Sequence, residues 1–188
     1  MNKVILMSIQ PKWLVKILNG EKTIEIRKTT PKCELPIDVY LYCTKGTLYF
    51  NRTLLNPNLF HREGKVIVKF TLNKVEEVVD NGSLYRINND VAHTNKVARN
   101  SCLDFKEMKK YLEGKNGYAY HIDNLVIFDK PMELREFETS NIPDNAVFES
   151  RDGERYFYLP ERQTWHFYSS PLTKAPQSWQ YAYVRNDK

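Results

Sequence analysis

The sequence predicts an α+β fold in which about six to eight short strands form a small, closed or nearly closed barrel with two or more flanking helices. Three observations lead to this prediction. Several short segments alternate apolar and polar residues, as half-buried strands do. Two segments carry the start and stop signals of helices. Strands and helices do not alternate regularly along the chain, which is typical of the α+β class.

Three elements are predicted near the N-terminus. An apolar run at 3–7 predicts a buried strand. A helix is expected at 11–19, because a proline suits its first position, a glycine follows its end, and apolar residues recur between them at helical spacing. Residues 23–27 then alternate, with isoleucines on one face, and predict a strand whose other face is polar.

The middle of the chain is interpreted in the same way. Segments 36–43 and 65–72 alternate and predict strands, while the stretch 44–64 between them contains turn residues and predicts a loop. The sequence DFKE, which starts at Asp104, has the spacing of a capping box. Together with the glycine that follows, it predicts a second helix at 105–113.

The last third of the chain is expected to be mostly strand. A strand is predicted at 118–128, a hairpin with an Asp-Gly turn at 146–158, and a final strand at 178–184. The sequence shows no internal repeat and no linker rich in glycine or proline. We therefore expect a single domain over residues 1–188, with a hairpin insertion near 144–168.

Composition limits the class of protein. No stretch approaches the roughly 18 to 20 apolar residues that span a bilayer, and the first ten residues lack the apolar stretch of a secretory signal. The three cysteines include no CxxC pair, and the four histidines have no metal-ligand spacing. We expect a cytoplasmic protein with no membrane partner, no disulfide framework, no metal and no cofactor.

Charge and aromatic content favour a nucleic-acid partner. Lys and Arg number 28 against 23 Asp and Glu, and the net charge of +5 is compatible with a polyanionic ligand. The 12 Tyr, 9 Phe and 3 Trp are interleaved with basic residues, as base stacking in a cationic groove requires. The alternative is that the tyrosines fill half-buried sheet faces.

The stretch GEKTIEIRK at 20–28 is the first candidate ligand site. It places Glu25 and Arg27 on one strand face, with Lys22 at the preceding junction. The planar guanidinium of Arg27 could grip a phosphate or a base edge, while Glu25 holds it or accepts from an exocyclic amine. The alternative is an ion pair on a solvated sheet face, worth about 0 to 1 kcal/mol.

Further candidates lie in two other stretches. In GYAYHID, His121 and Asp123 share a strand face, so the imidazole is either oriented toward a ligand or simply half-buried and satisfied. In KAPQSWQYAYV, Gln177 could read a base edge, and Trp179 is either a stacking surface or part of the core. The ligand-binding candidates are therefore Lys22, Glu25, Arg27, Tyr42, His121, Gln177, Ser178 and Trp179.

Three stretches resemble one protein family. GEKTIEIR, after a helix that begins with proline, resembles the G-x-K-x-x-E-x-R signature of ASCH-domain proteins, members of the PUA-like superfamily. GYAYHIDNLVIFDKP, at 117–131, and KAPQSWQYAYV, at 174–184, resemble segments of ASCH proteins that are common in Gram-positive bacteria and their phages. The resemblance implies a small PUA-like β-barrel flanked by helices, with Lys22, Glu25 and Arg27 in its ligand site.

The resemblance also implies a function, the binding of RNA or of a modified nucleoside or nucleotide in a basic cleft. The alternative is a hydrolase in the same cleft, either an amidohydrolase of the N4-acetylcytidine type or a ribonuclease. In the amidohydrolase branch, a nucleophilic threonine stands where this chain has Glu25. An enzyme would therefore use Lys22 as general base with Glu25 or Thr23. A protein-binding role of the hairpin aromatics is a third alternative that no motif supports.

Overall fold

The computed structural model describes residues 3–45, 63–82, 85–139, 147–151, 154–168 and 171–184. The largest of its sheets has six strands, namely β1 (Lys3–Ile9), β3 (Ile37–Cys43), β4 (Val66–Leu72), β8 (Asp123–Met132), β9 (Phe137–Thr139) and β13 (Trp179–Val184). Their order across the sheet is β8-β4-β3-β1-β13-β9. β1 and β3 run parallel, and the other neighbouring pairs are antiparallel.

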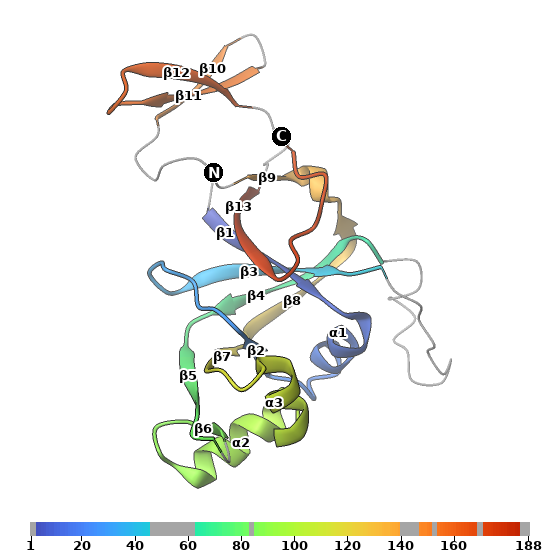
Figure 1. Cartoon of the computed structure of the whole chain (residues 1–188). Coiled ribbons are helices and arrows are strands. Elements are labelled where there is room, and N and C mark those ends of the chain that lie inside the picture. The colour runs from blue at the N-terminus through green and yellow to red at the C-terminus, as the bar shows by residue number, and fades with distance from the viewer. Residues whose placement is uncertain are drawn as a thin grey trace.

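A second, antiparallel sheet carries the GEKTIEIRK stretch. It contains β2 (Ile24–Arg27), β7 (Gly117–His121), β5 (Val75–Asp80) and β6 (Tyr85–Arg86), in that order. The helices are α1 (Pro11–Leu18), α2 (Val91–Ser101) and α3 (Phe105–Leu112), with a 3-10 turn at Leu134–Glu136. Figure 1 shows α2 and α3 at the lower end of the molecule, beside this sheet. No helix in the described ranges is long and apolar enough to cross a membrane.

The predicted hairpin is part of a third sheet. β10 (Val147–Arg151) and β11 (Glu154–Leu159) are antiparallel, and β12 (Thr164–Tyr168) adds a strand on the other side of β11. The predicted Asp-Gly turn at 152–153 lies outside the described residues. Figure 1 draws this sheet apart from the other two. The expectation of one domain with an insertion stays a prediction.

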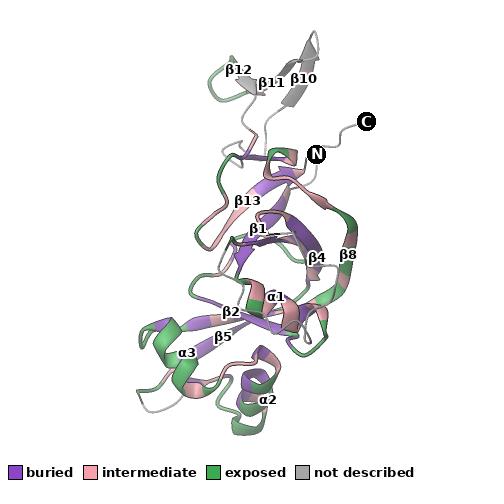
Figure 2. Cartoon of the chain, turned by 90° about the vertical axis from the view of Figure 1, so that its right-hand side faces the viewer, coloured by how far each residue is buried: buried purple, intermediate pink, exposed green. Residues whose placement is uncertain are grey.

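Apolar side chains gather in three clusters around these sheets. One packs Leu14 and Ile17 of α1 against β1, β3 and β4. A second packs α2 and α3 against Ile24 and Ile26 of β2, and a third lies on the opposite face of β1. Figure 2 shows the buried strand segments, in purple, inside the molecule. Since side chains alternate along a strand, the isoleucines of β2 turn toward the helices, and its Glu and Arg turn to the other face.

That second face of β2 is not solvated. All four residues of β2 are buried, including the two charged ones, Glu25 and Arg27. Lys22, just before the strand, is buried as well. Because a buried charge is costly unless it is paired and hydrogen-bonded, these side chains need specific partners.

The helix signals in the sequence correspond to observed caps. The Asp104 side chain accepts from the Glu107 N–H at 2.7 Å, and the Glu107 side chain accepts from the Asp104 N–H at 3.1 Å, which is a complete capping box. α3 ends at Leu112, close to the expected end, because Glu113 and Gly114 take positive φ angles of 57° and 70°. α1 begins with Pro11, as predicted.

The α+β class is confirmed, but the barrel is not. Within the described residues, no hydrogen-bonded pairing closes either of the two larger sheets. The strands number more than eight, and β5, β6, β9 and β12 are the strands that were not expected. The predicted strand at 118–128 is two strands, since β7 ends at His121 and β8 starts at Asp123. Asn124 has a φ of 47°, which bends the chain there. Most of the predicted loop at 44–64 lies outside the described residues.

Candidate functional site

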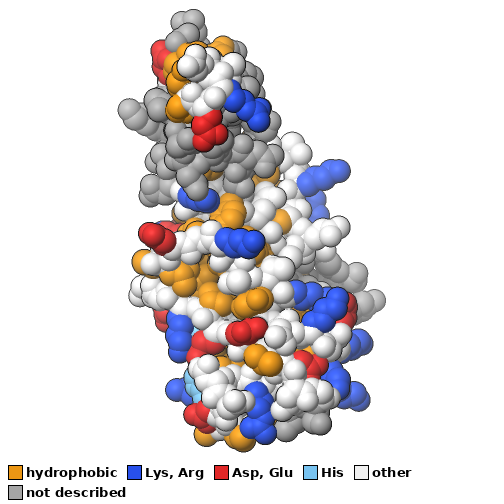
Figure 3. Space-filling model, turned by 60° about the vertical axis from the view of Figure 1, so that its left-hand side comes forward, with side chains coloured by type: hydrophobic (Ala, Val, Ile, Leu, Met, Phe, Trp, Pro, Cys, Tyr) orange, Lys and Arg blue, Asp and Glu red, His pale blue; other side chains and the backbone are white. Residues whose placement is uncertain are grey.

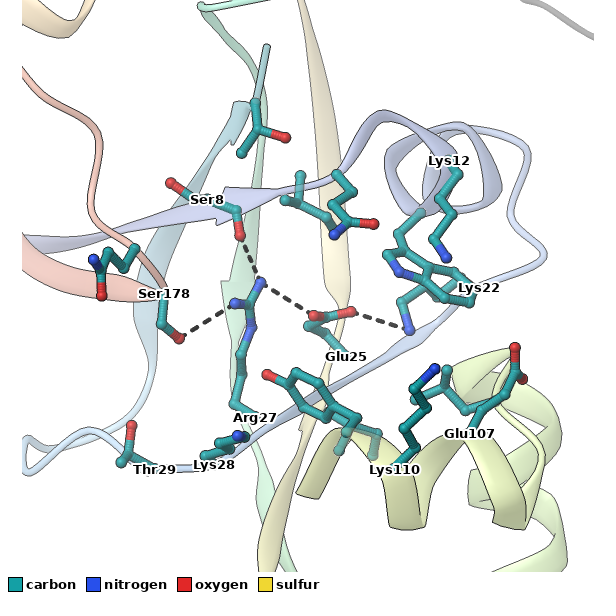
Figure 4. Close-up of a pocket in the computed structure, with 18 of the residues that line it drawn as sticks. Ser8, Lys12, Lys22, Glu25, Arg27, Lys28, Thr29, Glu107, Lys110 and Ser178 are labelled. Carbon is teal, nitrogen blue, oxygen red and sulfur yellow. Dashed lines mark hydrogen bonds and ion pairs between the residues drawn. The ribbon is translucent and has the colours of Figure 1, made fainter. Parts of the chain in front are cut away.

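A pocket of about 940 Å³ lies where β1, α1, β2, α3 and the segment before β13 meet (Figure 4). The charged residues that line it are five cations and three carboxylates, namely Lys12, Lys22, Arg27, Lys28, Lys110, Glu25, Glu107 and Glu113. Polar and aromatic groups fill much of the remaining wall, and they include Ser8, Gln10, Trp13, Thr29, Thr44, Tyr111, Gln177 and Ser178.

Lys22 is held at one side of the pocket and is only 2% exposed. Its Nζ donates to the Ser101 carbonyl oxygen at 2.6 Å and lies 3.0 Å from Glu25 Oε2. Nζ also lies 5.2 Å from the centroid of the Trp13 ring. Ser101 is the last residue of α2, where the helix dipole presents partial negative charge. The three N–H donors of the ammonium therefore have a carboxylate, a helix end and an aromatic face as partners.

Arg27 joins three elements and is 6% exposed. Its Nη2 donates to the Ser8 carbonyl oxygen at 2.8 Å and lies 3.1 Å from Glu25 Oε1, and its Nη1 donates to Ser178 Oγ at 3.3 Å. These contacts connect β2 to β1 and to the segment before β13 (Figure 4). The buried Nε has no hydrogen-bond partner. The Nε–H is thus a buried donor that no described group accepts from.

Glu25 lies between the two cations, with one oxygen on each. At 8% exposure it does not belong to a solvated ion pair, so the surface interpretation of the stretch is wrong. Here β1 and the segment before β13 cover the polar face, which an alternating pattern alone cannot reveal. Two buried cations share one carboxylate, and this leaves an excess of positive charge beside the pocket.

Aromatic rings and further cations complete the wall. Lys12 Nζ lies 4.5 Å from the centroid of the Trp13 ring. Lys28 bonds Glu113 at 2.7 Å, and its Nζ lies 5.6 Å from the centroid of the Tyr111 ring. Burial raises the pKa of the Tyr111 hydroxyl, while the nearby Arg27 opposes that rise. The phenol therefore stays neutral near pH 7 and can donate a hydrogen bond to a ligand.

Five of the predicted residues line this one pocket, namely Lys22, Glu25, Arg27, Gln177 and Ser178. They come from the first and third of the stretches that resemble the family, which lie near opposite ends of the chain. Trp179 lies next to the pocket without lining it, because its indole N–H donates to Thr29 Oγ1 at 3.0 Å and its ring packs edge-on against Tyr181.

Two predicted residues lie elsewhere for clear reasons. Tyr42 is 8% exposed and packs in the apolar cluster on the opposite face of β1. Thr23 is exposed and precedes β2, which begins at Ile24. Thr23 therefore lies outside the strand, and the alternation of side chains along β2 does not place it on the same face as Glu25. The Thr23 hydroxyl does not line the pocket.

His121 also lies away from the pocket. In the sheet register it pairs with Ile24, so it lies on the face opposite Glu25. His121 is half-buried and its ring nitrogen bonds Glu76, as in the second of the two alternatives, while Asp123 accepts from Asn73.

Glu76 is the centre of a separate charged cluster. Its carboxylate is bonded by His93, His121 and Lys74. Burial raises the pKa of Glu76, but the hydrogen bonds from these three partners outweigh burial and lower the pKa to about 2. In the part of the chain that the structure describes, no group of three His, Cys, Asp or Glu side chains is arranged to hold a metal ion.

Several pocket residues were not predicted. Trp13 and its neighbour Lys12 carried a weak signal, an aromatic ring beside a cation at the start of a helix. Ser8, Lys110 and Tyr111 carried none, because they reach the pocket only through the packing of β1 and α3.

No family model and no curated protein matches the chain. Among solved structures, it is similar to ASCH from Zymomonas mobilis, with 19% identity and a TM-score of 0.48 over 69% of this chain and 73% of that chain. A mutant of the same protein, in which one tyrosine is replaced by phenylalanine, gives 19% identity and a TM-score of 0.49, over 71% and 77%. These structural neighbours are ASCH-domain proteins, the family whose motifs the sequence resembles.

Proposed function

We propose that the chain binds RNA, or a modified nucleoside or nucleotide, in the pocket that contains Lys22, Glu25 and Arg27. The observation that carries the proposal is the pocket itself. Its volume of about 940 Å³ is in the range of small-molecule sites, and its wall combines cations, aromatic rings and side-chain amides. A nucleotide needs all three kinds of contact, for its phosphate, its base face and its base edge.

Two rings in the wall can take up a base. Trp13 on α1 and Tyr111 on α3 both line the pocket, and stacking on such rings contributes about 1 to 3 kcal/mol per base. Lys12 lies over the Trp13 ring and is exposed. A base that stacks on Trp13 can displace the Lys12 ammonium from the ring, and the ammonium is then available to contact a phosphate of the same ligand.

Base edges can be read by two amides. Gln10 and Gln177 line the pocket from the end of β1 and from the segment before β13, and each carries both donors and an acceptor. Neither amide has a hydrogen-bond partner among the described residues. Such groups recognise the polar edge of a base that is not paired with another strand.

Positive charge is concentrated in the wall of the pocket. On the face drawn in Figure 3, Lys and Arg side chains are interspersed with Asp and Glu, and they form no continuous basic patch among the residues described there. The pocket lining is richer in cations than in carboxylates. We therefore expect a single strand to contact the protein at the pocket and its rim.

Salt titration of a labelled, short single-stranded RNA tests the proposal. Lys110 is a suitable position for substitution because it is exposed and has no ion pair among the described residues, so Lys110→Gln should leave the fold intact. If Lys110 contacts a phosphate, the plot of log association constant against log salt concentration should become shallower in Lys110→Gln, by about 0.7 in slope. Lys96→Gln, an exposed lysine of α2 outside the pocket, is the matched control and should keep the wild-type slope.

The proposal would be contradicted if neither RNA nor any nucleoside or nucleotide bound to the wild type. It would also be contradicted if Lys110→Gln and Lys96→Gln reduced RNA affinity equally, because such binding would be unrelated to the pocket. Far-ultraviolet circular dichroism of both variants checks that the fold is unchanged.

A further inference from the structure

The charges of the pocket are unevenly paired. Lys28 is bonded to Glu113 at 2.7 Å, so these two neutralise each other. Glu107 accepts from the Asp104 N–H at 3.1 Å and thereby caps α3. The third carboxylate, Glu25, is divided between Lys22 and Arg27 and lies too deep to serve other cations.

Three cations remain without a carboxylate of their own. Arg27 shares Glu25 with Lys22, whose ammonium also has the end of α2 as a partner, and the Nε of Arg27 is unpartnered. Lys12 and Lys110 have no ion pair among the described residues. These three cations come from β2, α1 and α3, and Figure 4 shows them on three sides of the same pocket.

These three cations favour a negatively charged ligand over a neutral one. Arg27 is 6% exposed, so its charge is poorly hydrated, and half a carboxylate does not compensate it. An anion in the pocket would supply a counter-charge to Arg27 and bring the two exposed lysines inward. Charge-assisted hydrogen bonds to such an anion are about twice as strong as neutral ones.

We infer that the pocket takes a nucleotide through a terminal phosphate monoester, and that an uncharged nucleoside is a poor ligand. The inference rests on the proposed function and specifies its substrate class. A phosphate monoester carries about −1.5 to −2 charge near pH 7 and offers three acceptor oxygens, which matches three cations better than the single charge of an internal phosphodiester. The phosphate belongs between Lys12, Arg27 and Lys110, and the base belongs near Trp13 and Tyr111.

A charge series measured by isothermal titration calorimetry tests the inference. The probes are the four ribonucleosides, their 5′- and 3′-monophosphates, and the methyl esters of those monophosphates. At pH 7.5 at least one monophosphate should bind about tenfold or more tightly than its nucleoside, with its methyl ester between them. The advantage should shrink at pH 5, because the second phosphate pKa is about 6.

Variants connect the phosphate preference to the pocket. Lys110→Gln should reduce the affinity for the monophosphate several-fold more than the affinity for the nucleoside, whereas Lys96→Gln should change neither. Equal affinity for nucleoside, methyl ester and monophosphate would overturn the inference and leave the proposed function standing. RNA binding without any preference for monophosphates would do the same. Failure of RNA, nucleosides and nucleotides alike to bind would overturn both.

Discussion

Replacing Lys22 with methionine should destabilise the protein strongly. Lys22 is 2% exposed, and its ammonium contacts Glu25 at 3.0 Å and the Ser101 carbonyl oxygen at 2.6 Å. Removing one partner of a buried ion pair costs about 3 to 5 kcal/mol. Because Arg27 would still hold Glu25 and methionine fills a similar volume, we expect about 3 kcal/mol for Lys22→Met.

Equilibrium urea unfolding and thermal unfolding measure this effect. For a chain of this length, a loss of about 3 kcal/mol corresponds to a fall in Tm of about 6 to 12 °C. Lys16→Met is the matched control, because Lys16 forms an ion pair of similar length with Glu21, 3.1 Å, on the surface. Surface pairs contribute little, so the control should unfold close to the wild type.

The double variant Lys22→Met/Glu25→Gln tests the ion pair directly. If the pair accounts for the loss, the double variant should be less destabilised than the sum of the two single variants. The reasoning would be refuted if Lys22→Met were no less stable than Lys16→Met. In that case Lys22 would not be the buried structural cation described here, and a catalytic role for it would regain support.

Three further outcomes are expected. Because the pKa of Glu76 is lowered to about 2 in the folded protein, its stabilising contribution is present above its unfolded pKa of 4.5 and is lost as pH falls from there toward 2. Acid titration of unfolding should therefore show a smaller loss for Glu76→Gln than for the wild type. Burial raises the pKa of Cys43 to about 12, so iodoacetamide at pH 8, followed by mass spectrometry, should label Cys33 and Cys102 well before Cys43. The wild type should release no acetate from N4-acetylcytidine, since Glu25 stands where the amidohydrolase branch has its threonine; acetate release by the wild type would make the chain an amidohydrolase.

Local motifs predicted the centre of the pocket. Lys22, Glu25 and Arg27 lie within six positions of one another, and the register of one strand is enough to bring them together. Gln177 and Ser178 were predicted from a second motif, although sequence alone could not show that it meets the first. That meeting depends on Arg27, which donates to the Ser178 hydroxyl, and on β13, which pairs with β1.

The remaining pocket wall depends on tertiary packing. Tyr111 and Lys110 reach the pocket because α3, which starts at a capping box, packs beside β2. The sequence predicted the capping box but not where the helix packs. α2 was missed for a different reason. Its buried residues include Thr94 and Ser101, so its buried face is not marked by apolar periodicity. Yet the end of α2 supplies the carbonyl group that holds Lys22.

Photochemical crosslinking tests the central claim most directly, namely that nucleotides bind in this pocket. A single-stranded RNA containing 4-thiouridine would be irradiated with the wild-type protein, and the crosslinked peptides would be identified by mass spectrometry. We predict crosslinks to α1, which carries Trp13, and to α3, which carries Tyr111. Crosslinks confined to the separate sheet β10-β11-β12, where Trp165 is 43% exposed, would contradict the claim and assign RNA binding to that sheet.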